Sequence, residues 1–129
     1  MSTIFTKIIN GDIPSYKVAE SETCYAFLDI EPVTRGHVLV VPKIEVDYIF
    51  DLDDDRLADL MNFAKYVARK MDKVFDCARI GVTVIGLEVP HTHIHLMPIN
   101  GIADMDFGKD KLSFEEEEMK RIAKLIREA

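Results

Sequence analysis

Apolar residues recur along this chain with two different periods, which divide it into predicted strands and helices. Near-continuous apolar runs at 23–30 and 37–43 predict two strands, and the second should lie centrally in a sheet because it has no polar face. Shorter runs at 16–20 and 79–86 predict two more strands. The stretch 89–98 completes a predicted set of five, and the strand at 79–86 should pair with it as a hairpin.

Helical spacing appears in three other segments. From about residue 53 to 75, apolar side chains recur every three or four positions with charged ones opposite, which predicts one long amphipathic helix. Acidic residues at its start, Asp53 among them, suit an N-terminal cap. A short helical turn is expected from Ile4, ended by Gly11. Ser113, with Glu116 three residues later, predicts a capping box that opens a C-terminal helix.

Length and composition indicate a single globular domain over residues 1–129, with 48% hydrophobic and 30% charged residues. The formal net charge of −7 argues against a nucleic-acid polymer as partner, because such binding depends on basic groups that meet phosphates. No apolar run approaches the ~20 residues of a membrane span, and the N-terminus lacks the pattern of a secretory signal. We therefore expect a cytoplasmic protein with no membrane partner.

The candidate chemistry is concentrated in the stretch 89–98, which holds three of the four histidines in the chain. His91, His93 and His95 alternate with Thr92, Ile94 and Leu96, so a strand here would have an imidazole face and an apolar face. Neighbouring imidazoles would lie roughly 6.5 Å apart. Pro90 and Pro98 bracket the run and should limit the strand to about seven residues.

Three interpretations of this histidine run are open. The imidazoles are a packed or solvated surface, or they bind zinc or copper, or one is a nucleophile flanked by two that handle phosphate and leaving group. The spacing His-x-His-x-His-x-x-Pro resembles the signature of the histidine triad (HIT) family of nucleotide hydrolases and transferases, in particular its Hint branch. The resemblance extends from about residue 2 to 100, through Phe27-Leu28-Asp29 and the strand 37–43, and leaves a C-terminal loop and helix at 101–129.

This resemblance implies an α+β, HIT-like homodimer in which each subunit has a five-stranded antiparallel sheet, one long helix and a C-terminal helix. It implies that His93 attacks the α-phosphorus of a purine nucleotide, while His91 and His95 contact phosphate or leaving group. The residues that it places around the nucleotide are Ile4, Phe5, Ile8, Phe27, Leu28, Asp29, Ile30 and His37. For Ile4, Phe5 and Ile8 an ordinary core role is equally open. For Asp29 and His37 the alternatives are a turn-starting acid and a structural histidine.

The segment before the histidines departs from the family pattern, which commonly has a Gly- and Asn-rich loop with Gly-Gln there. Leu87 and Glu88 stand where an amide would help to hold the phosphate, and a carboxylate beside a phosphate repels it. Two functions therefore remain open. One is a hydrolase that cleaves purine nucleoside phosphoramidates or dinucleotides at the α-phosphate through a nucleotidyl-histidine. The other is a nucleotide-binding or scaffold protein with weak turnover.

No cofactor or metal is expected. Some bacterial HIT proteins hold a structural zinc through a Cys-x-x-Cys pair near the N-terminus, a histidine after the Pro-Lys strand end and one histidine of the triad. The matching positions here hold Thr3, Thr6 and Glu45, so three of the four soft or imidazole ligands are missing and the remaining set cannot close a tetrahedral site.

Overall fold

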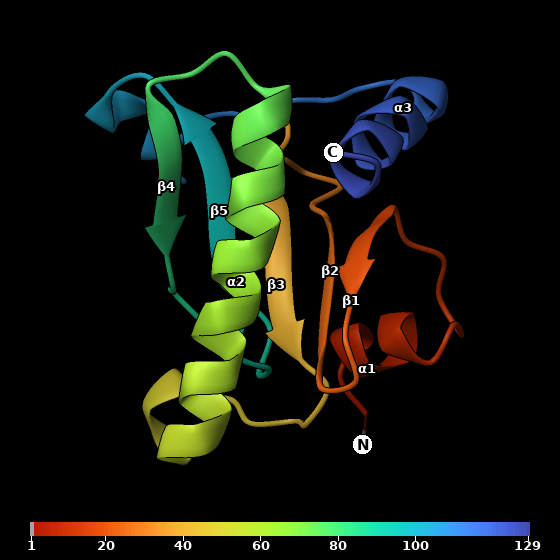
Figure 1. The fold of residues 1–129 in the computed structure, drawn as a ribbon, viewed down its shortest axis with the longest axis vertical. Helices are drawn as coiled ribbons and strands as arrows, with labels where there is room; N and C mark the ends of the chain where they lie inside the picture. The colour runs from red at the N-terminus through yellow and green to blue at the C-terminus, as the bar shows by residue number, and fades with distance from the viewer. Residues whose placement is uncertain (1) are drawn as a thin grey trace.

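The computed structural model describes residues 2–129 and shows the predicted α+β fold, with a five-stranded antiparallel sheet in the order β1-β2-β3-β5-β4 (Figure 1). Among these residues no helix has both the length and the apolar character that crossing a membrane requires. In chain order the elements are α1 (Ile4–Ile9), β1 (Lys17–Glu20), β2 (Cys24–Leu28), β3 (Val38–Pro42), the 3₁₀ turn η1 (Ile49–Asp51), α2 (Asp54–Val74), β4 (Arg79–Thr83), β5 (Ile94–Ile99), the 3₁₀ turn η2 (Ile102–Met105) and α3 (Glu116–Arg127).

One face of the sheet is covered by α2 and α3, and the main core lies between these helices and the sheet. Figure 1 shows α2 running along the sheet, with α3 beside it near β1 and β2. Leu28, Val40 and Ile94 face this side from three neighbouring strands, and each is at most 2% exposed. Because side chains alternate along a strand, the residues beside them point to the other face.

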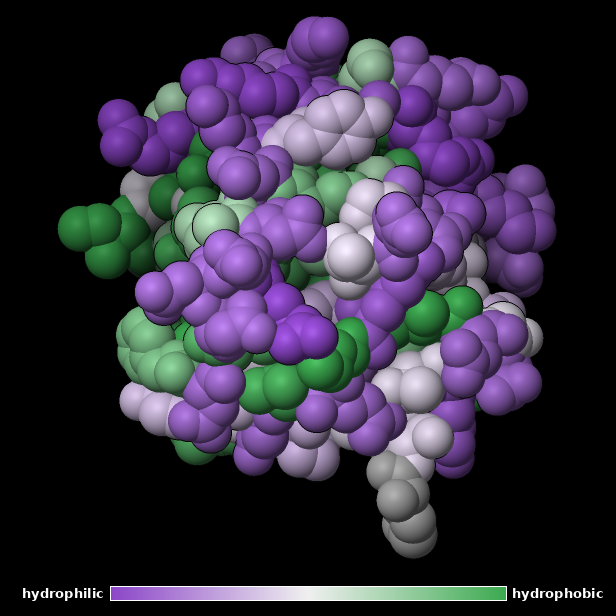
Figure 2. Space-filling view, turned by 60° about the horizontal axis from the view of Figure 1, so that its bottom comes forward, coloured by the Kyte–Doolittle hydropathy of each residue, from purple (hydrophilic) through white to green (hydrophobic). Residues whose placement is uncertain are grey.

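A smaller apolar cluster lies on that other face, beneath α1. Phe5 of α1 packs against Phe27, with ring centroids 5.5 Å apart, and the other buried members of the cluster are Tyr25, Leu39 and Val41. The strand pairing places His95 opposite Leu39, so the candidate chemistry lies on this thinly covered face. The outer surface seen in Figure 2 is mainly hydrophilic, with apolar side chains in separate patches.

The histidine strand differs from its prediction at both ends. β5 begins at Ile94, so His91 and His93 precede the ladder, and it continues through Pro98 to Ile99. Proline was predicted to end this strand, but β3 pairs only with Ile94–Leu96. One side of Pro98 therefore has no strand to receive an N–H, and proline is tolerated there. β5 does pair antiparallel with β4 as predicted, through a longer connection than a tight hairpin.

The predicted start of the C-terminal helix is wrong. Ser113 does not cap α3. The helix begins at Glu116, and its N-cap residue is Glu115, whose side chain makes no capping hydrogen bond. The backbone N–H of Leu112 donates to the carbonyl of Pro32 and Phe114 packs on the main core, so the chain stays extended through Ser113. By contrast, the predicted acidic cap of the long helix is confirmed, because the Asp53 side chain accepts a hydrogen bond from the Arg56 amide.

Candidate active site

A pocket of about 210 Å³ opens on the α1 face, at the ends of β2, β3 and β5. Two of the predicted triad histidines, His93 and His95, line it together with the predicted ligand-binding residues Asp29 and His37. The other lining residues are Glu31, Val33, Ile85, Gly86, Leu87, Glu88, Phe107 and Lys111. Strand alternation accounts for the gathering, since Asp29 and His37 continue the face that carries Phe27 and Leu39.

His93 is held with one ring nitrogen free. Its Nδ1 lies 2.7 Å from the backbone carbonyl oxygen of His91, which accepts hydrogen bonds only, so Nδ1 carries the proton. The lone pair is therefore on Nε2. Phe5 packs edge-on against the ring at a centroid distance of 5.0 Å and fixes its tilt. This hydrogen bond fixes the tautomer of His93 and leaves Nε2 available as a nucleophilic atom.

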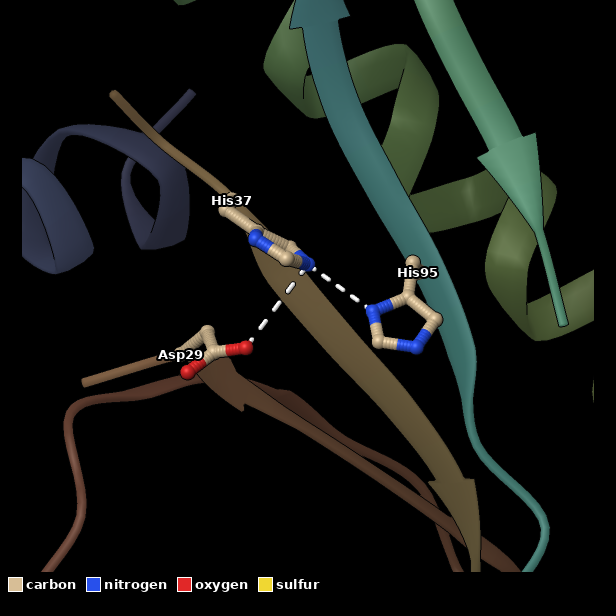
Figure 3. A group of neighbouring side chains, drawn as sticks. All are labelled: Asp29, His37 and His95. Carbon is tan, nitrogen blue, oxygen red and sulfur yellow. Dashed lines mark hydrogen bonds and ion pairs between the residues drawn. The ribbon is translucent and has the colours of Figure 1, made fainter. Parts of the chain in front are cut away.

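A chain of hydrogen bonds fixes the opposite arrangement in His95. The Val33 amide donates to His37 Nδ1 at 3.0 Å, so the proton of the neutral His37 ring is on Nε2. That Nε2–H donates to His95 Nδ1 at 2.9 Å (Figure 3). The neutral His95 ring must therefore carry its own proton on Nε2. The pocket thus places an imidazole lone pair and an imidazole N–H side by side, with the two ring centroids 5.0 Å apart.

Burial lowers the pKa of three histidines, His37, His91 and His95, and so favours their neutral form. It lowers the pKa of His37 from 6.5 to about 3, with smaller contributions from His95 and Lys111. Burial likewise lowers the pKa of His95 to about 4, and His93 adds to the shift. For Asp29, burial raises the pKa of the carboxyl group, although a hydrogen bond from the Glu31 amide partly offsets it. Two neutral N–H donors in series therefore persist at neutral pH.

Asp29, His37 and His95 also present ligand atoms within 4.8 Å of one another, as a metal site would require (Figure 3). Their hydrogen bonds oppose that use. A metal on His37 Nε2 would need the ring proton on Nδ1, where the Val33 N–H already donates. The closest approach of Asp29 to this nitrogen is 3.8 Å. The geometry instead fits a carboxylate that faces the pocket beside a fixed pair of imidazoles.

His91 does not reach the pocket. Its side chain is 0% exposed, and both ring nitrogens have protein partners. Nε2 lies 2.8 Å from the carbonyl oxygen of Pro42 and Nδ1 lies 2.7 Å from the hydroxyl of Thr3. The expected phosphate contact from this ring is therefore not available in this structure. Sequence alternation placed it with the other two, but the turn before β5 directs it beneath α1.

The remaining predicted ligand-binding residues are divided among several environments. Phe5, Ile8 and Phe27 belong to the apolar cluster beneath α1, which packs behind His93. None of the three lines the pocket directly. Leu28 points into the main core on the opposite face of the sheet. Ile4 and Ile30 are exposed, at 49% and 74%. Of the eight, only Asp29 and His37 line the pocket itself.

Sequence reasoning missed the contribution of the C-terminal loop. Phe107 packs edge-on against His95 at 4.9 Å and against His37 at 5.9 Å, and so closes the pocket over this pair. Lys111 supplies the one cationic side chain in the lining. A lone aromatic residue in a Gly- and Asp-rich loop was the only available signal, because the loop has no hydrophobic period.

Comparisons with known proteins identify related sequences. The HIT domain model matches residues 10–101. An adenosine 5'-monophosphoramidase of Saccharomyces cerevisiae is 40% identical over 96 residues, which cover 74% of this chain and 61% of the yeast protein. The corresponding Schizosaccharomyces pombe enzyme is 36% identical, over 76% of this chain and 74% of its own length.

Solved structures are similar over almost the whole chain. A Hit-like protein from Bartonella henselae superposes with a TM-score of 0.84 at 29% identity, covering 98% of this chain and 95% of that one. A HIT family member from Bacillus subtilis gives a TM-score of 0.76 at 32% identity, with coverage of 99% and 96%. The chain therefore belongs to the HIT family.

Proposed function

We propose that this protein is a nucleotide hydrolase that cleaves purine nucleoside phosphoramidates, or dinucleotides, at the α-phosphorus through a nucleotidyl intermediate on His93. The observation that carries the proposal is the pairing of opposite tautomers in one pocket. His93 offers a lone pair at Nε2, and His95 offers an N–H at its own Nε2. Nucleophilic attack needs the first atom, and a phosphoryl oxygen that gains charge during attack needs the second.

The chemistry then proceeds in two displacements at phosphorus. His93 Nε2 forms a bond to the α-phosphorus as the bond to the leaving nitrogen or oxygen breaks, and that atom takes up a proton from solvent. Water next attacks the same phosphorus, the bond to His93 breaks, and the released nucleoside monophosphate leaves with a proton returned to solvent. Throughout, the carbonyl of His91 keeps the proton on Nδ1 and so stabilises the charged ring of the intermediate.

Other lining residues suit the rest of a nucleotide. The Asp29 carboxylate has a free oxygen facing the pocket, which fits the hydroxyl groups of a ribose. Lys111 is positioned to offset phosphate charge. The cavity of about 210 Å³ is smaller than a whole purine nucleotide, so the base should lie toward the exposed side chains of Ile4 and Ile30. The names of the two yeast relatives favour a phosphoramidate as substrate.

Replacement of His93 tests this proposal. The His93→Ala variant should lose turnover of adenosine 5'-phosphoramidate by at least ~10³-fold while it binds AMP within a few-fold of wild type, because a covalent step is lost and few ground-state contacts are. Wild type quenched during turnover should carry a nucleotidyl mass addition on the peptide that contains His93. Wild-type-like activity in His93→Ala would show that the nucleophile has been misassigned.

The scaffold alternative is supported by one specific observation. Leu87 and Glu88 line the pocket, and Leu87 is 88% exposed, so this loop brings an aliphatic and a carboxylate to the phosphate side. If repulsion by Glu88 limits catalysis, Glu88→Gln should raise kcat/KM by about threefold to tenfold, with Glu22→Gln outside the pocket as the charge-matched control. A wild type and a Glu88→Gln variant that both bind AMP, yet never turn over, would favour the scaffold function.

A further inference from the structure

A cluster of polar side chains outside the pocket joins the start of α1 to His91. It comprises Thr3, Thr6, Glu45 and His91, and we call it the N-terminal polar cluster. Thr3 lies 2.7 Å from His91 Nδ1, across 88 positions of sequence. One carboxylate oxygen of Glu45 accepts from the Thr3 amide at 2.7 Å and from the Thr6 hydroxyl at 2.6 Å. None of the four residues lines the pocket.

The donors and acceptors of this cluster have one consistent assignment. The Pro42 carbonyl accepts only, so the proton of the neutral His91 ring is on Nε2, and Nδ1 is an acceptor. The Thr6 hydroxyl gives its proton to Glu45. The Thr3 hydroxyl is therefore the group that donates to His91 Nδ1, while its oxygen accepts from the Thr6 amide at 3.1 Å as the N-cap of α1.

The segment that carries Glu45 is itself anchored to the histidine turn. Both the amide and the hydroxyl of Thr92 donate to the carbonyl of Val46, at 2.7 and 2.6 Å. Although its side chain is exposed, Glu45 is thus held in a fixed position beside the histidine turn, where it acts as an acceptor. The hydrogen bonds from the Thr6 hydroxyl and the Thr3 amide hold the pKa of the Glu45 carboxyl below its usual range, so it is ionised at neutral pH.

His91 passes this constraint on to His93 by two routes. Its backbone carbonyl accepts the Nδ1–H of His93 at 2.7 Å, so any movement of His91 changes the bond that sets the tautomer of His93. In addition, Phe5 of α1 packs against both rings, with centroid distances of 5.7 and 5.0 Å. Thr3 also caps α1, the helix that carries Phe5. The Thr3 side chain therefore influences both the Phe5 ring that packs against His93 and the residue, His91, whose carbonyl accepts from His93 Nδ1.

We propose that Thr3 is a positioning residue for His93, held in place by Glu45, and that the N-terminal polar cluster keeps the nucleophilic ring in its Nδ1–H form. This inference rests on the proposed function of His93. A helix cap alone would need only an acceptor for the Thr6 amide. The hydroxyl of Thr3 also donates to a ring that is 0% exposed, and an unpaired buried nitrogen there is costly.

The test compares variants that separate hydroxyl chemistry from helix stability. Thr3→Val removes the hydroxyl, and Thr3→Ser retains it. Glu45→Ala removes the side-chain acceptor, and Glu45→Gln retains one in its amide oxygen. Lys7→Gly is the matched control, because it weakens α1 at an exposed position but leaves the cluster intact. All are assayed with adenosine 5'-phosphoramidate at a temperature where circular dichroism shows each to be folded.

Thr3→Val should lower kcat roughly tenfold with KM within about twofold of wild type, because the pocket contacts remain. Thr3→Ser and Glu45→Gln should restore most of the loss, Glu45→Ala should lower kcat about threefold, and Lys7→Gly should leave kcat unchanged. Imidazole ¹⁵N spectra should show His93 as a single Nδ1–H tautomer in wild type and Lys7→Gly, and as a mixture in Thr3→Val.

Two results would overturn the inference: a Thr3→Val variant whose kcat matches that of Lys7→Gly, or a His93 tautomer that is unchanged by the loss of the hydroxyl. Failure of the proposed function is a separate outcome, since a wild type with no turnover on any phosphoramidate would contradict only that function. The ¹⁵N spectra need no turnover, so they decide the role of Thr3 in that case as well.

Discussion

Roles within the histidine triad depend on partners that are remote in sequence. Strand alternation predicted one face for His91, His93 and His95, and the resemblance to the HIT family added Asp29 and His37. In the structure, His93 and His95 line the pocket together with Asp29 and His37. Strand alternation did not separate His91 from them, because the acceptor that turns its ring away belongs to Pro42 and the donor to Thr3. Such assignments follow from tertiary hydrogen bonds, which no local pattern encodes.

The buried His37 should make stability fall on mild acidification. Its pKa is lowered to about 3 in the folded chain, against 6.5 when it is free. Between these values the unfolded chain binds a proton that the folded chain does not, so the stabilisation is present above about pH 6.5 and decreases as pH falls. From pH 7 to 5 the loss should be on the order of 2 kcal/mol for this residue.

Urea unfolding at the two pH values measures this effect, and His37→Asn, which cannot titrate, is the comparison. The variant should be less stable at pH 7 but should lose about 2 kcal/mol less between pH 7 and 5. Carboxyl groups with lowered pKa, such as Glu118, take up protons only below pH 5, so they do not contribute to the change between pH 7 and 5. An equal loss in both proteins would mean that His37 is already protonated or exposed at pH 7.

The N-terminal polar cluster also bears on metal binding. Thr3, Thr6 and Glu45 hydrogen-bond to one another and to His91, so the positions that would need soft or imidazole ligands hold oxygen donors and acceptors. We expect less than ~0.1 zinc per chain by elemental analysis after dialysis against zinc and then buffer. A stoichiometry near one would revive the metal interpretation of the triad and would count against the assigned hydrogen bonds.

At the scale of elements, periodicity predicted the existence of every long helix and strand, and the errors fall at the ends. β5 continues past Pro98 because its neighbour β3 has already ended, and α3 starts late because Phe114 is drawn into the core. Both boundaries are set by which neighbour is present in space. Asp53 was predictable as a cap because capping is decided within three residues of sequence.

Gly36, just before β3, lies in close contact with the C-terminal end of α2. Its φ of +86° lies in the left-handed region, and a methyl group there would overlap the ring of Phe75, the C-cap residue of α2. Gly36→Ala should therefore destabilise the fold by about 2–4 kcal/mol, through backbone strain together with overpacking. Since His37 follows directly, activity should fall along with the free energy of unfolding.

Gly11 offers a control within the same chain. It has a φ of +83° and nothing within 4 Å of an added methyl group. Gly11→Ala should cost only about 1 kcal/mol, which is the strain contribution alone. Denaturant unfolding of both variants separates the two effects. Similar losses in the two would show that the contact between α2 and the start of β3 yields without cost.

For the whole molecule, the number of strands and the α+β class could be predicted from the sequence, but the strand order could not, because it depends on long-range pairing. That order leaves two edges, which are treated differently. β1 lies beside α3, and Arg127 donates a hydrogen bond of 2.6 Å to the Lys17 carbonyl. No strand of the described residues pairs with the outer side of β4.

The exposed edge of β4 is where we expect the second subunit of a homodimer. Val82 on β4 is 53% exposed, and Val84 and Ile85 just beyond it are 36% and 44% exposed. An open edge with apolar side chains is a surface that a partner strand covers, and isologous pairing of β4 with its own copy would extend the antiparallel sheet across both subunits. Light scattering should give about twice the 14.7 kDa chain mass at micromolar concentration.

Val82→Lys should convert this dimer to a monomer, because a charge at the centre of the pairing must be buried without a partner. Leu125→Lys, on α3 near the opposite edge, is the control and should leave the mass unchanged. Loss of the dimer in Leu125→Lys alone would move the interface to the β1 side. A wild type that stays monomeric at 100-fold higher concentration would mean that the exposed edge of β4 is tolerated without a partner, and that the pocket is complete within one chain.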